Sequence, residues 1–344
     1  MAEYTKTWLS IDSQLDKLES RGVTILNRQT GHQLLSAVGY YRVTGYLYPL
    51  RESEKYVDEN GRPRVRILSQ YRASTTLEYA AELIEFDRKL RMLMLDGIER
   101  IEVSLRTRLA YTLGRKSAFA HLDPTSFVSS FTEPKINPET AVSSISPHQE
   151  WMERVDERRA DSHEAFVVHF RENYNDTMPI WALTEILEFG QVSRLYNGLN
   201  NSVATEIANY YAVPTKRMMI SWISSLNYVR NLSAHHARLF NRKLVVAPAR
   251  PSHTKVPLLG HLKDQDSAKQ TFGIYNAMAV MTYLLRAVDP DSAWPERLVN
   301  LVNSFPTTEH ISVKSMGFPA GWTALQLWET HVNKRRDGQL ERQN

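Results

Sequence analysis

Apolar residues recur every three or four positions from residue 83 to residue 109, and this spacing constrains the fold more than any other feature of the sequence. Thr75 followed by Glu78 has the spacing of a capping box just before the run. Residues spaced in this way lie along one side of a helix. We therefore predict one long helix whose apolar side packs against other helices, with Gly97 marking a close approach to a neighbour. The apolar positions are Leu83, Leu90, Leu93, Met94, Ile98, Ile101, Leu105 and Leu109.

Shorter helical patterns lie on both sides of the long one, and strand signals are few. Within 51–72, the pair Asn60-Gly61 is a tight-turn signal that indicates either a small hairpin or a mobile loop. The segment 39–49 contains two glycines and a proline, so we do not expect it to form a helix interior. The predicted fold class is mainly α. The other expected helices span about 11–18, 32–38, 149–174, 180–190, 192–199, 202–211, 215–231, 267–288 and 294–305.

These patterns divide the chain, whose 344 residues are enough to bury a substantial core, into four segments. We expect an N-terminal helical and aromatic segment over 1–72 and the main helical domain over 73–290. A C-terminal helical extension would follow over 291–333, and the charged tail 334–344 would be disordered.

Composition and missing motifs exclude several classes of protein. The chain has no cysteine, so it has neither disulfides nor thiolate metal sites. Its longest apolar run, 277–285, is far shorter than the ~20 residues that cross a bilayer, and the start of the chain does not resemble a secretory signal. His163, Glu164 and His169 lack metal-ligand spacing, and no phosphate-binding glycine motif occurs. We expect a soluble cytoplasmic protein with no metal, no cofactor and no membrane partner.

One window of the sequence has a strong local charge. The 57 residues from Ile207 to Lys263 contain no Asp or Glu but nine Lys and Arg, while the whole chain carries only +4. The remaining residues therefore sum to −5, since 4 − 9 = −5. A concentrated positive potential is typical of a site for a polyanion, and RNA is the expected partner. The RNA-binding residues that we predict in this window are Lys216, Arg217, Arg238, Arg242, Lys243 and Arg250.

Near the middle of this window, Arg230, Asn231, His235 and His236 fall within seven positions. A guanidinium offers a permanently charged planar fork that suits a phosphate, and an imidazole exchanges protons near neutral pH. Together they have the chemistry of metal-free RNA cleavage. These four residues are the predicted catalytic site.

The spacing of the four residues leaves alternatives open. Arg230 continues the apolar stripe that ends at Leu226, so it either binds an anion or serves structurally, capping carbonyls or pairing with a carboxylate. His235 lies ~140° around a continuous helix from Arg230. Convergence on one phosphate therefore needs either a helix break near residues 231–233 or a second subunit. Asn231 is four positions before His235 and would orient its ring if the helix persists. The two histidines also have a structural reading, as helix-end residues stabilised by the dipole.

Two other groups are better explained by structure than by chemistry. Glu185 and Glu188 are neighbours on a helix, and such pairs are usually exposed or salt-bridged. Tyr40, Tyr41, Tyr46 and Tyr48 have the ring chemistry to stack on unpaired bases, but a packed aromatic core is the more common outcome.

Several segments, taken in order over about residues 15–330, resemble the Abi-like abortive-infection proteins of bacteria, of the AbiD and AbiF kind. The resemblance implies a HEPN-type helical bundle with additional N-terminal and C-terminal helical elements, and it places the R-N-x-x-x-H signature on Arg230, Asn231 and His235. The segments that carry it are Gly39-Tyr40-Tyr41-Arg42 with Gly45-Tyr46, Phe86-Asp87-Arg88 to Ile98-Glu99, Pro179-Ile180-Trp181 to Phe189-Gly190, Asn227-Tyr228-Val229-Arg230-Asn231 with Ala234-His235-His236, Arg238-Leu239-Phe240-Asn241-Arg242, and Met316-Gly317-Phe318-Pro319.

The resemblance also implies a function. Such domains pair as homodimers around a metal-independent RNA-cleaving cleft, so we expect an endoribonuclease that acts in antiphage defence or as a growth-arresting toxin. A noncoding RNA or an antitoxin protein would restrain it. The alternatives are a non-cleaving RNA-binding protein that holds a structured RNA and a helical scaffold that meets an acidic protein.

Overall fold

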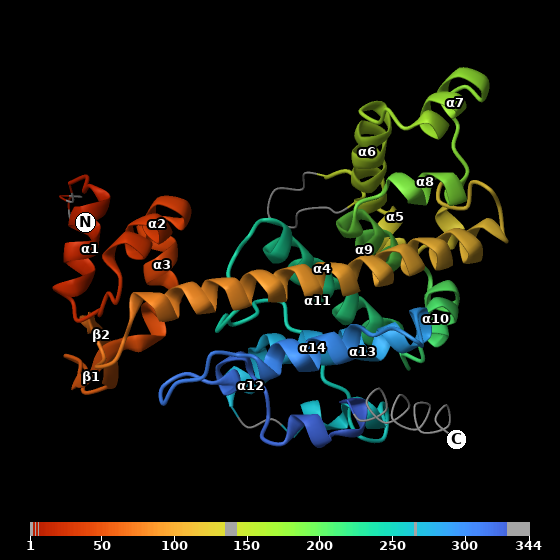
Figure 1. The fold of residues 1–344 in the computed structure, drawn as a ribbon. Helices are drawn as coiled ribbons and strands as arrows, with labels where there is room; N and C mark the ends of the chain where they lie inside the picture. Colours follow the sequence, from red (N-terminus) through yellow and green to blue (C-terminus); the bar gives the residue numbers. More distant parts are fainter. Residues whose placement is uncertain (1–2, 4, 6, 135–142, 265–266, 329–344) are drawn as a thin grey trace, which may run out of the picture. The chain divides into compact units, whose positions relative to one another are not determined.

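The structure is a computed structural model that describes residues 3, 5, 7–134, 143–264 and 267–328. Over these ranges the chain is mainly helical, which confirms the predicted fold class (Figure 1). Contacts within the chain define two compact units, one of Met1–Leu90 with Asn300–Ser315 and one of Arg91–Val299 with Met316–Asn344. The segment limits expected from the sequence remain predictions, and the predicted disordered tail lies outside the described residues.

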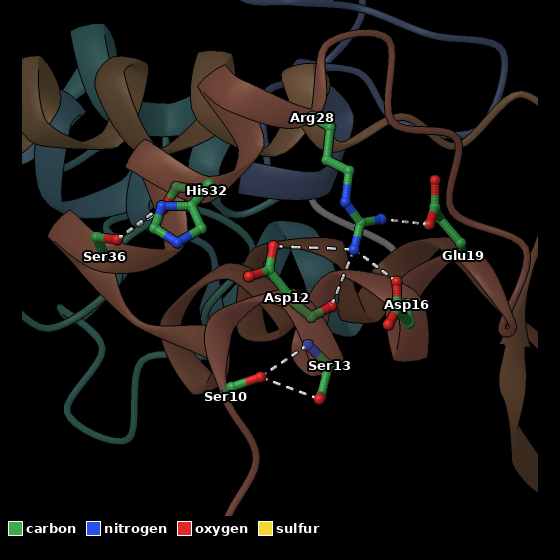
Figure 2. A network of polar contacts seen from close by, with 8 residues as sticks. All are labelled: Ser10, Asp12, Ser13, Asp16, Glu19, Arg28, His32 and Ser36. Atoms are coloured by element: carbon green, nitrogen blue, oxygen red, sulfur yellow. Dashed lines mark hydrogen bonds and ion pairs between the residues drawn. The ribbon is translucent and has the colours of Figure 1, made fainter.

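The first unit begins with α1 (Ile11–Glu19) and α2 (Arg28–Val38), both close to their predicted positions. Side chains cap both helices, because Ser10 accepts from the N–H of Ser13 and Asn27 accepts from two N–H groups of α2. Arg28 then ties the two helices together, as Figure 2 shows. Its guanidinium lies 2.6 Å from the Asp16 carboxylate and 3.0 Å from that of Glu19.

The segment 39–49 is helical, so the expectation for it was wrong. Gly39, at φ 81°, ends α2 and directly precedes α3 (Tyr40–Leu47), with Gly45 inside the helix. Tertiary packing overrides the weak propensity here, because α3 buries one side and the Tyr46 hydroxyl donates to Asp87 at 2.6 Å. Of the tyrosines expected in an aromatic core, Tyr46 is buried, whereas Tyr41 is 76% exposed.

The Asn60-Gly61 signal marks a hairpin, which settles the choice between hairpin and loop. After the short 3-10 turn η1 (Tyr48–Leu50), strand β1 (Arg51–Val57) pairs antiparallel with β2 (Pro63–Tyr71). Gly61 has a φ of 73° in the turn, a backbone conformation that suits glycine. This hairpin is the only sheet among the residues that the structure describes.

The long predicted helix is α4 (Leu77–Gly114), whose residues up to Leu90 belong to the first unit and the rest to the second. All eight apolar residues used to predict it are buried. Thr76 rather than Thr75 is the N-cap of the helix, because its hydroxyl accepts from the Tyr79 N–H. A Cβ added at Gly97 would come within 2.8 Å of the Trp294 ring nitrogen, which confirms the predicted close approach.

Three helices predicted as continuous are interrupted in the second unit. Residues 161–164 separate α6 (Pro147–Ala160) from α7 (Ala165–Asn173), and Gly273 separates α12 (Ala268–Phe272) from α13 (Ile274–Val288). The helix expected over 180–190 is interrupted at Leu187 and Glu188, because Glu188 and Gln191 form a capping box that starts a new helix. The helices are α5 (Ser129–Thr132), α6 (Pro147–Ala160), α7 (Ala165–Asn173), α8 (Ile180–Ile186), α9 (Phe189–Gly198), α10 (Asn201–Tyr210), α11 (Lys216–Ala234), α12 (Ala268–Phe272), α13 (Ile274–Val288) and α14 (Trp294–Asn303), which ends in the range of the first unit.

Helix α11 is packed against α9, α10 and α13. Its buried side includes Met219, Trp222 and Leu226, and α13 is buried along most of its length. This packing fixes the position of the C-terminal end of α11, which carries the predicted catalytic residues. No helix in the described ranges combines the length and the apolar character needed to cross a membrane. The remaining elements are the short 3-10 turns η2 (Pro124–Ser126), η3 (Pro257–Leu262), η4 (Val313–Met316) and η5 (Trp322–Ala324).

Candidate functional site

The predicted catalytic residues lie at the C-terminal end of α11, where the helix ends in a Schellman motif. His236 N–H donates to the Ser233 carbonyl at 3.1 Å, and Ala237 N–H donates to the Leu232 carbonyl at 2.8 Å. The motif needs a left-handed residue after the helix, a position that glycine usually occupies. Here His236 adopts it, with φ 56°. The backbone of a residue other than glycine is strained in this conformation, and such strain concentrates at functional sites.

Helix α11 is continuous through the predicted catalytic residues. It extends to Ala234, and the His235 N–H still donates to the Asn231 carbonyl at 3.0 Å. The expected alternative of a helix break near residues 231–233 is therefore wrong. Arg230 and His235 remain ~140° apart around one helix, so a single chain does not direct both toward one phosphate. The other alternative, a second copy of the chain, stays a prediction.

Arg230 lies at the margin of the buried stripe rather than on it. The stripe continues from Leu226 to Val229 and Ser233, while Arg230 is half-buried. Its Nη1 atom donates to the Asn231 side-chain oxygen at 3.4 Å. Arg230 also lines a cavity of about 750 Å³.

Glu102 of α4 is a buried acidic group whose charge interacts with that of Arg230. It is ion-paired with Arg106 one helical turn later and is only 9% exposed. Burial raises the pKa of the Glu102 carboxyl, and the positive charges of Arg106 and Arg230 partly oppose that shift. This carboxylate agrees with the structural reading of Arg230, in which an acid from another helix balances its charge.

The last carbonyls of α8 form another wall of the cavity. Arg106 donates to the Glu185 carbonyl at 3.3 Å, and Arg158 donates to the Ile186 carbonyl at 3.3 Å. Carbonyls at a helix C-terminus have no partner within the helix and carry partial negative charge, so both guanidiniums stabilise this end. These contacts fix α8 between α4 and α6.

Sequence reasoning missed the acidic and basic residues that surround Arg230. Glu185 and Glu188 are exposed, and Glu188 lies 4.0 Å from Arg158, as expected for such a pair. Nothing in the sequence indicated that they line a cavity together with Arg106 and Arg230. The burial of Glu102 could have been predicted from the sequence, because this residue lies four positions after Ile98 and three before Leu105, on the buried side of α4. The convergence of α4, α6, α8 and α11 has no signal in a single sequence.

The other three predicted catalytic residues are accessible. Asn231, His235 and His236 are all exposed at the end of α11. Two imidazoles and an amide are therefore open to a ligand that approaches this end of the helix. In the described part of the chain, no group of three or more His, Cys, Asp or Glu side chains has an arrangement that could hold a metal ion.

The predicted RNA-binding residues do not gather at one place. Lys216 and Arg217 begin α11, about 20 Å along the axis from Arg230 at 1.5 Å per residue. The Lys216 amine donates to the Leu199 carbonyl, and burial lowers its pKa. Lys216 therefore has a structural contact, whereas Arg217 is exposed.

The remaining basic residues follow α11 in a segment held along that helix. Trp222 Nε1 donates to the Ala249 carbonyl at 2.8 Å, and the Ser225 hydroxyl donates to the Val246 carbonyl at 2.9 Å. Arg250 donates to the Leu262 carbonyl at 3.3 Å, and Lys243 lies 4.5 Å from the centre of the Phe272 ring. Arg238 and Arg242 are closest in sequence to the histidines; both are half-buried, and Arg242 Nε donates to the Arg238 carbonyl at 2.8 Å.

The Abi-like protein family matches residues 33–241, which include α11 and the four predicted catalytic residues. The match covers more than half of the 344 residues, so the chain belongs to this family. Membership supports a role in abortive infection. No curated protein and no solved structure matches the chain.

Proposed function

We propose that this protein is a metal-independent endoribonuclease of the HEPN type that acts in abortive infection or arrests growth as a toxin. The observation that carries the proposal is the end of α11, where His235 and a strained His236 are exposed one turn beyond Arg230. The family match includes this segment, and the family supports the defensive role.

In the proposed mechanism, imidazole takes up or gives the protons that RNA cleavage moves. His235 acts as general base or acid between the attacking ribose 2′-hydroxyl and the leaving 5′-oxygen, a role worth typically ~10²–10⁴-fold in rate. Arg230 binds the scissile phosphate and stabilises the charge that develops on its oxygens. Asn231, which accepts a hydrogen bond from Arg230, orients the guanidinium or the imidazole. His236 is a second proton carrier or a neighbour that positions the first.

Cleavage chemistry provides the first test. Purified protein should cut RNA in the presence of EDTA and leave 2′,3′-cyclic phosphate ends. The His235→Ala variant should lose about 10²-fold or more in rate, because the general base is gone. His32→Ala, an exposed histidine on α2, is the matched control and should cut like the wild type. Inhibition by EDTA, or full activity of His235→Ala, would refute the proposed chemistry.

A second copy of the chain is part of the proposal, because one continuous helix separates Arg230 from His235. Arg230→Ala and His235→Ala, each inactive alone, should regain activity when mixed, since a mixed dimer rebuilds one site from two chains. Sedimentation establishes whether dimers form. If mixed dimers form but stay inactive, Arg230 and His235 act within one chain or do not act in cleavage.

The same separation favours one alternative, a non-cleaving RNA-binding protein. Binding uses the basic residues and does not require Arg230 and His235 to converge. That protein would bind RNA with steep salt dependence and leave it intact, and His235→Ala would retain wild-type affinity. In the nuclease, His235→Ala would also retain RNA affinity, but it would lose the cleavage that the wild type shows.

A further inference from the structure

We propose that the cavity beside Arg230 is a base-recognition pocket that selects guanine at the cleaved position of the RNA. This inference rests on the proposed function, in which Arg230 binds the scissile phosphate. Arg230 lines the cavity, so a nucleotide whose phosphate reaches this guanidinium has its base within reach of the interior. The volume of about 750 Å³ falls in the range of roughly 300–1,000 Å³ typical of small-molecule sites.

The charges of the lining exclude a phosphate from the interior. Five carboxylates and three guanidiniums line the cavity, so its acidic groups are in excess. A phosphate placed among them would meet net repulsion, whereas a neutral group rich in N–H donors would be attracted. The carboxylates belong to Glu102, Asp161, Glu164, Glu185 and Glu188.

Within this lining, Glu185 has the carboxylate most suited to a base. Glu102 is paired with Arg106, and Glu188 lies 4.0 Å from Arg158 and caps α9. Asp161, Glu164 and Glu185 are exposed and have no ion pair among the described residues, and of these three Glu185 is the one whose backbone carbonyl accepts from Arg106, a guanidinium of the same lining. Its backbone is therefore held at the cavity, and its carboxylate is accessible to accept hydrogen bonds.

Apolar groups supply a surface for the face of a base. The half-buried Phe166 of α7 lines the cavity and presents its ring, while Ile186 and Leu187, which also line it, are almost fully buried and back this wall. An aromatic ring provides stacking that every base accepts, so it adds affinity without choosing among bases. The choice therefore depends on the polar groups.

Guanine matches those polar groups better than the other bases. Its N1–H and N2–H donors lie side by side and suit the two oxygens of a carboxylate, while O6 and N7 accept from an arginine such as Arg158. Adenine and cytosine offer only an amino group as donor, and uracil offers a single ring N–H. The excess of acceptors in the lining favours the base with the longest donor edge.

The test measures binding of the four nucleoside 3′-monophosphates to the full-length protein by calorimetry. Guanosine 3′-monophosphate should bind about tenfold or more tightly than the other three, as expected for one bidentate contact. Glu185→Gln should remove most of this preference, because an amide cannot accept from both donors. Glu157→Gln, an exposed change on α6 outside the cavity, should keep it. Equal affinities, a preference for another base, or an unchanged preference in Glu185→Gln would overturn the proposal.

Cleavage-site mapping separates this proposal from the nuclease itself. If wild-type protein cuts RNA without regard to guanine, the nuclease stands and the base pocket is wrong. If guanosine 3′-monophosphate binds selectively but no RNA is cut, the pocket stands and the nuclease is wrong. Glu185→Gln should cut mixed-sequence RNA at more kinds of position than the wild type.

Discussion

The left-handed conformation of His236 leads to a prediction that separates the stability of α11 from its function. With φ 56°, His236 occupies a position that glycine adopts without strain. For other L-residues this conformation costs about 1–2 kcal/mol. Glycine loses part of that gain, about 0.5–1 kcal/mol, because its unfolded chain is more flexible. The net benefit of glycine over another residue at position 236 should be about 1 kcal/mol.

The experiment compares His236→Gly with His236→Ala. Both variants lack the imidazole, so the difference between them reports backbone strain and not side-chain contacts. Urea unfolding followed by tryptophan fluorescence should give His236→Gly the greater free energy of unfolding by about 1 kcal/mol, with equal denaturant slopes. His236→Asn should fall between the two, because asparagine tolerates this conformation.

Activity completes the comparison. If the His236 imidazole serves cleavage, both variants lose activity to the same extent while their stabilities differ. This pattern is expected where a strained residue is retained for function. His236→Gly that is no more stable than His236→Ala would refute the strain argument. A fully active His236→Gly would show that the imidazole is not needed.

Three further predictions concern packing and charge in the second unit. Gly97→Ala should lower the free energy of unfolding by about 1–3 kcal/mol, because the added methyl would lie 2.8 Å from Trp294. Gly190→Ala, whose methyl meets only ordinary contacts at 3.7 Å, should be neutral or stabilising in the same urea assay. Burial lowers the pKa of His121 from 6.5 to about 4. Between these two pH values only the unfolded state binds a proton at His121, so the free energy of unfolding is unaffected above pH 6.5 and falls by about 3 kcal/mol as the pH drops to 4. His121→Leu should flatten thermal stability over that pH range, and an unchanged slope would contradict the assignment. Glu102→Gln removes a negative charge near Arg230 and should tighten RNA binding at low salt, with the difference shrinking as salt is added. Fluorescence anisotropy with labelled RNA checks this, and equal affinities at low salt would count against the electrostatic coupling.

Local periodicity was enough to predict the long helix but not the interruptions of shorter ones. Helix α4 repeats its apolar positions over eight residues that are all buried, so period and packing agree. The break between α6 and α7 falls at Asp161-Ser162-His163-Glu164, which contains neither glycine nor proline. Helix α3 shows the opposite failure, since two glycines and a proline argued against a helix interior where burial and the hydrogen bond from Tyr46 to Asp87 support a helix.

The candidate site was predictable only as far as it is local. The end of α11 carries four of its residues within seven positions, and a single sequence reveals such a cluster. The cavity is different, because Glu102, Arg158 and Glu185 come from elements separated by tens of residues. Their meeting depends on how α4, α6 and α8 pack, which a pattern of residue types does not specify.

Packing also changes the interpretation of the window Ile207–Lys263, which contains no Asp or Glu. Arg230 lies in 57 residues without a carboxylate, yet Glu102, Glu185 and Glu188 line the cavity with it. Inside the cavity the window contributes Arg230 alone, whereas beyond the end of α11 Arg238 and Arg242 follow the exposed histidines. In the proposed nuclease, a nucleotide would therefore bind with its phosphate on Arg230 and its base toward Glu185. The reverse orientation would place the phosphate among carboxylates, so under this proposal charge would favour one orientation of the RNA before any base is recognised.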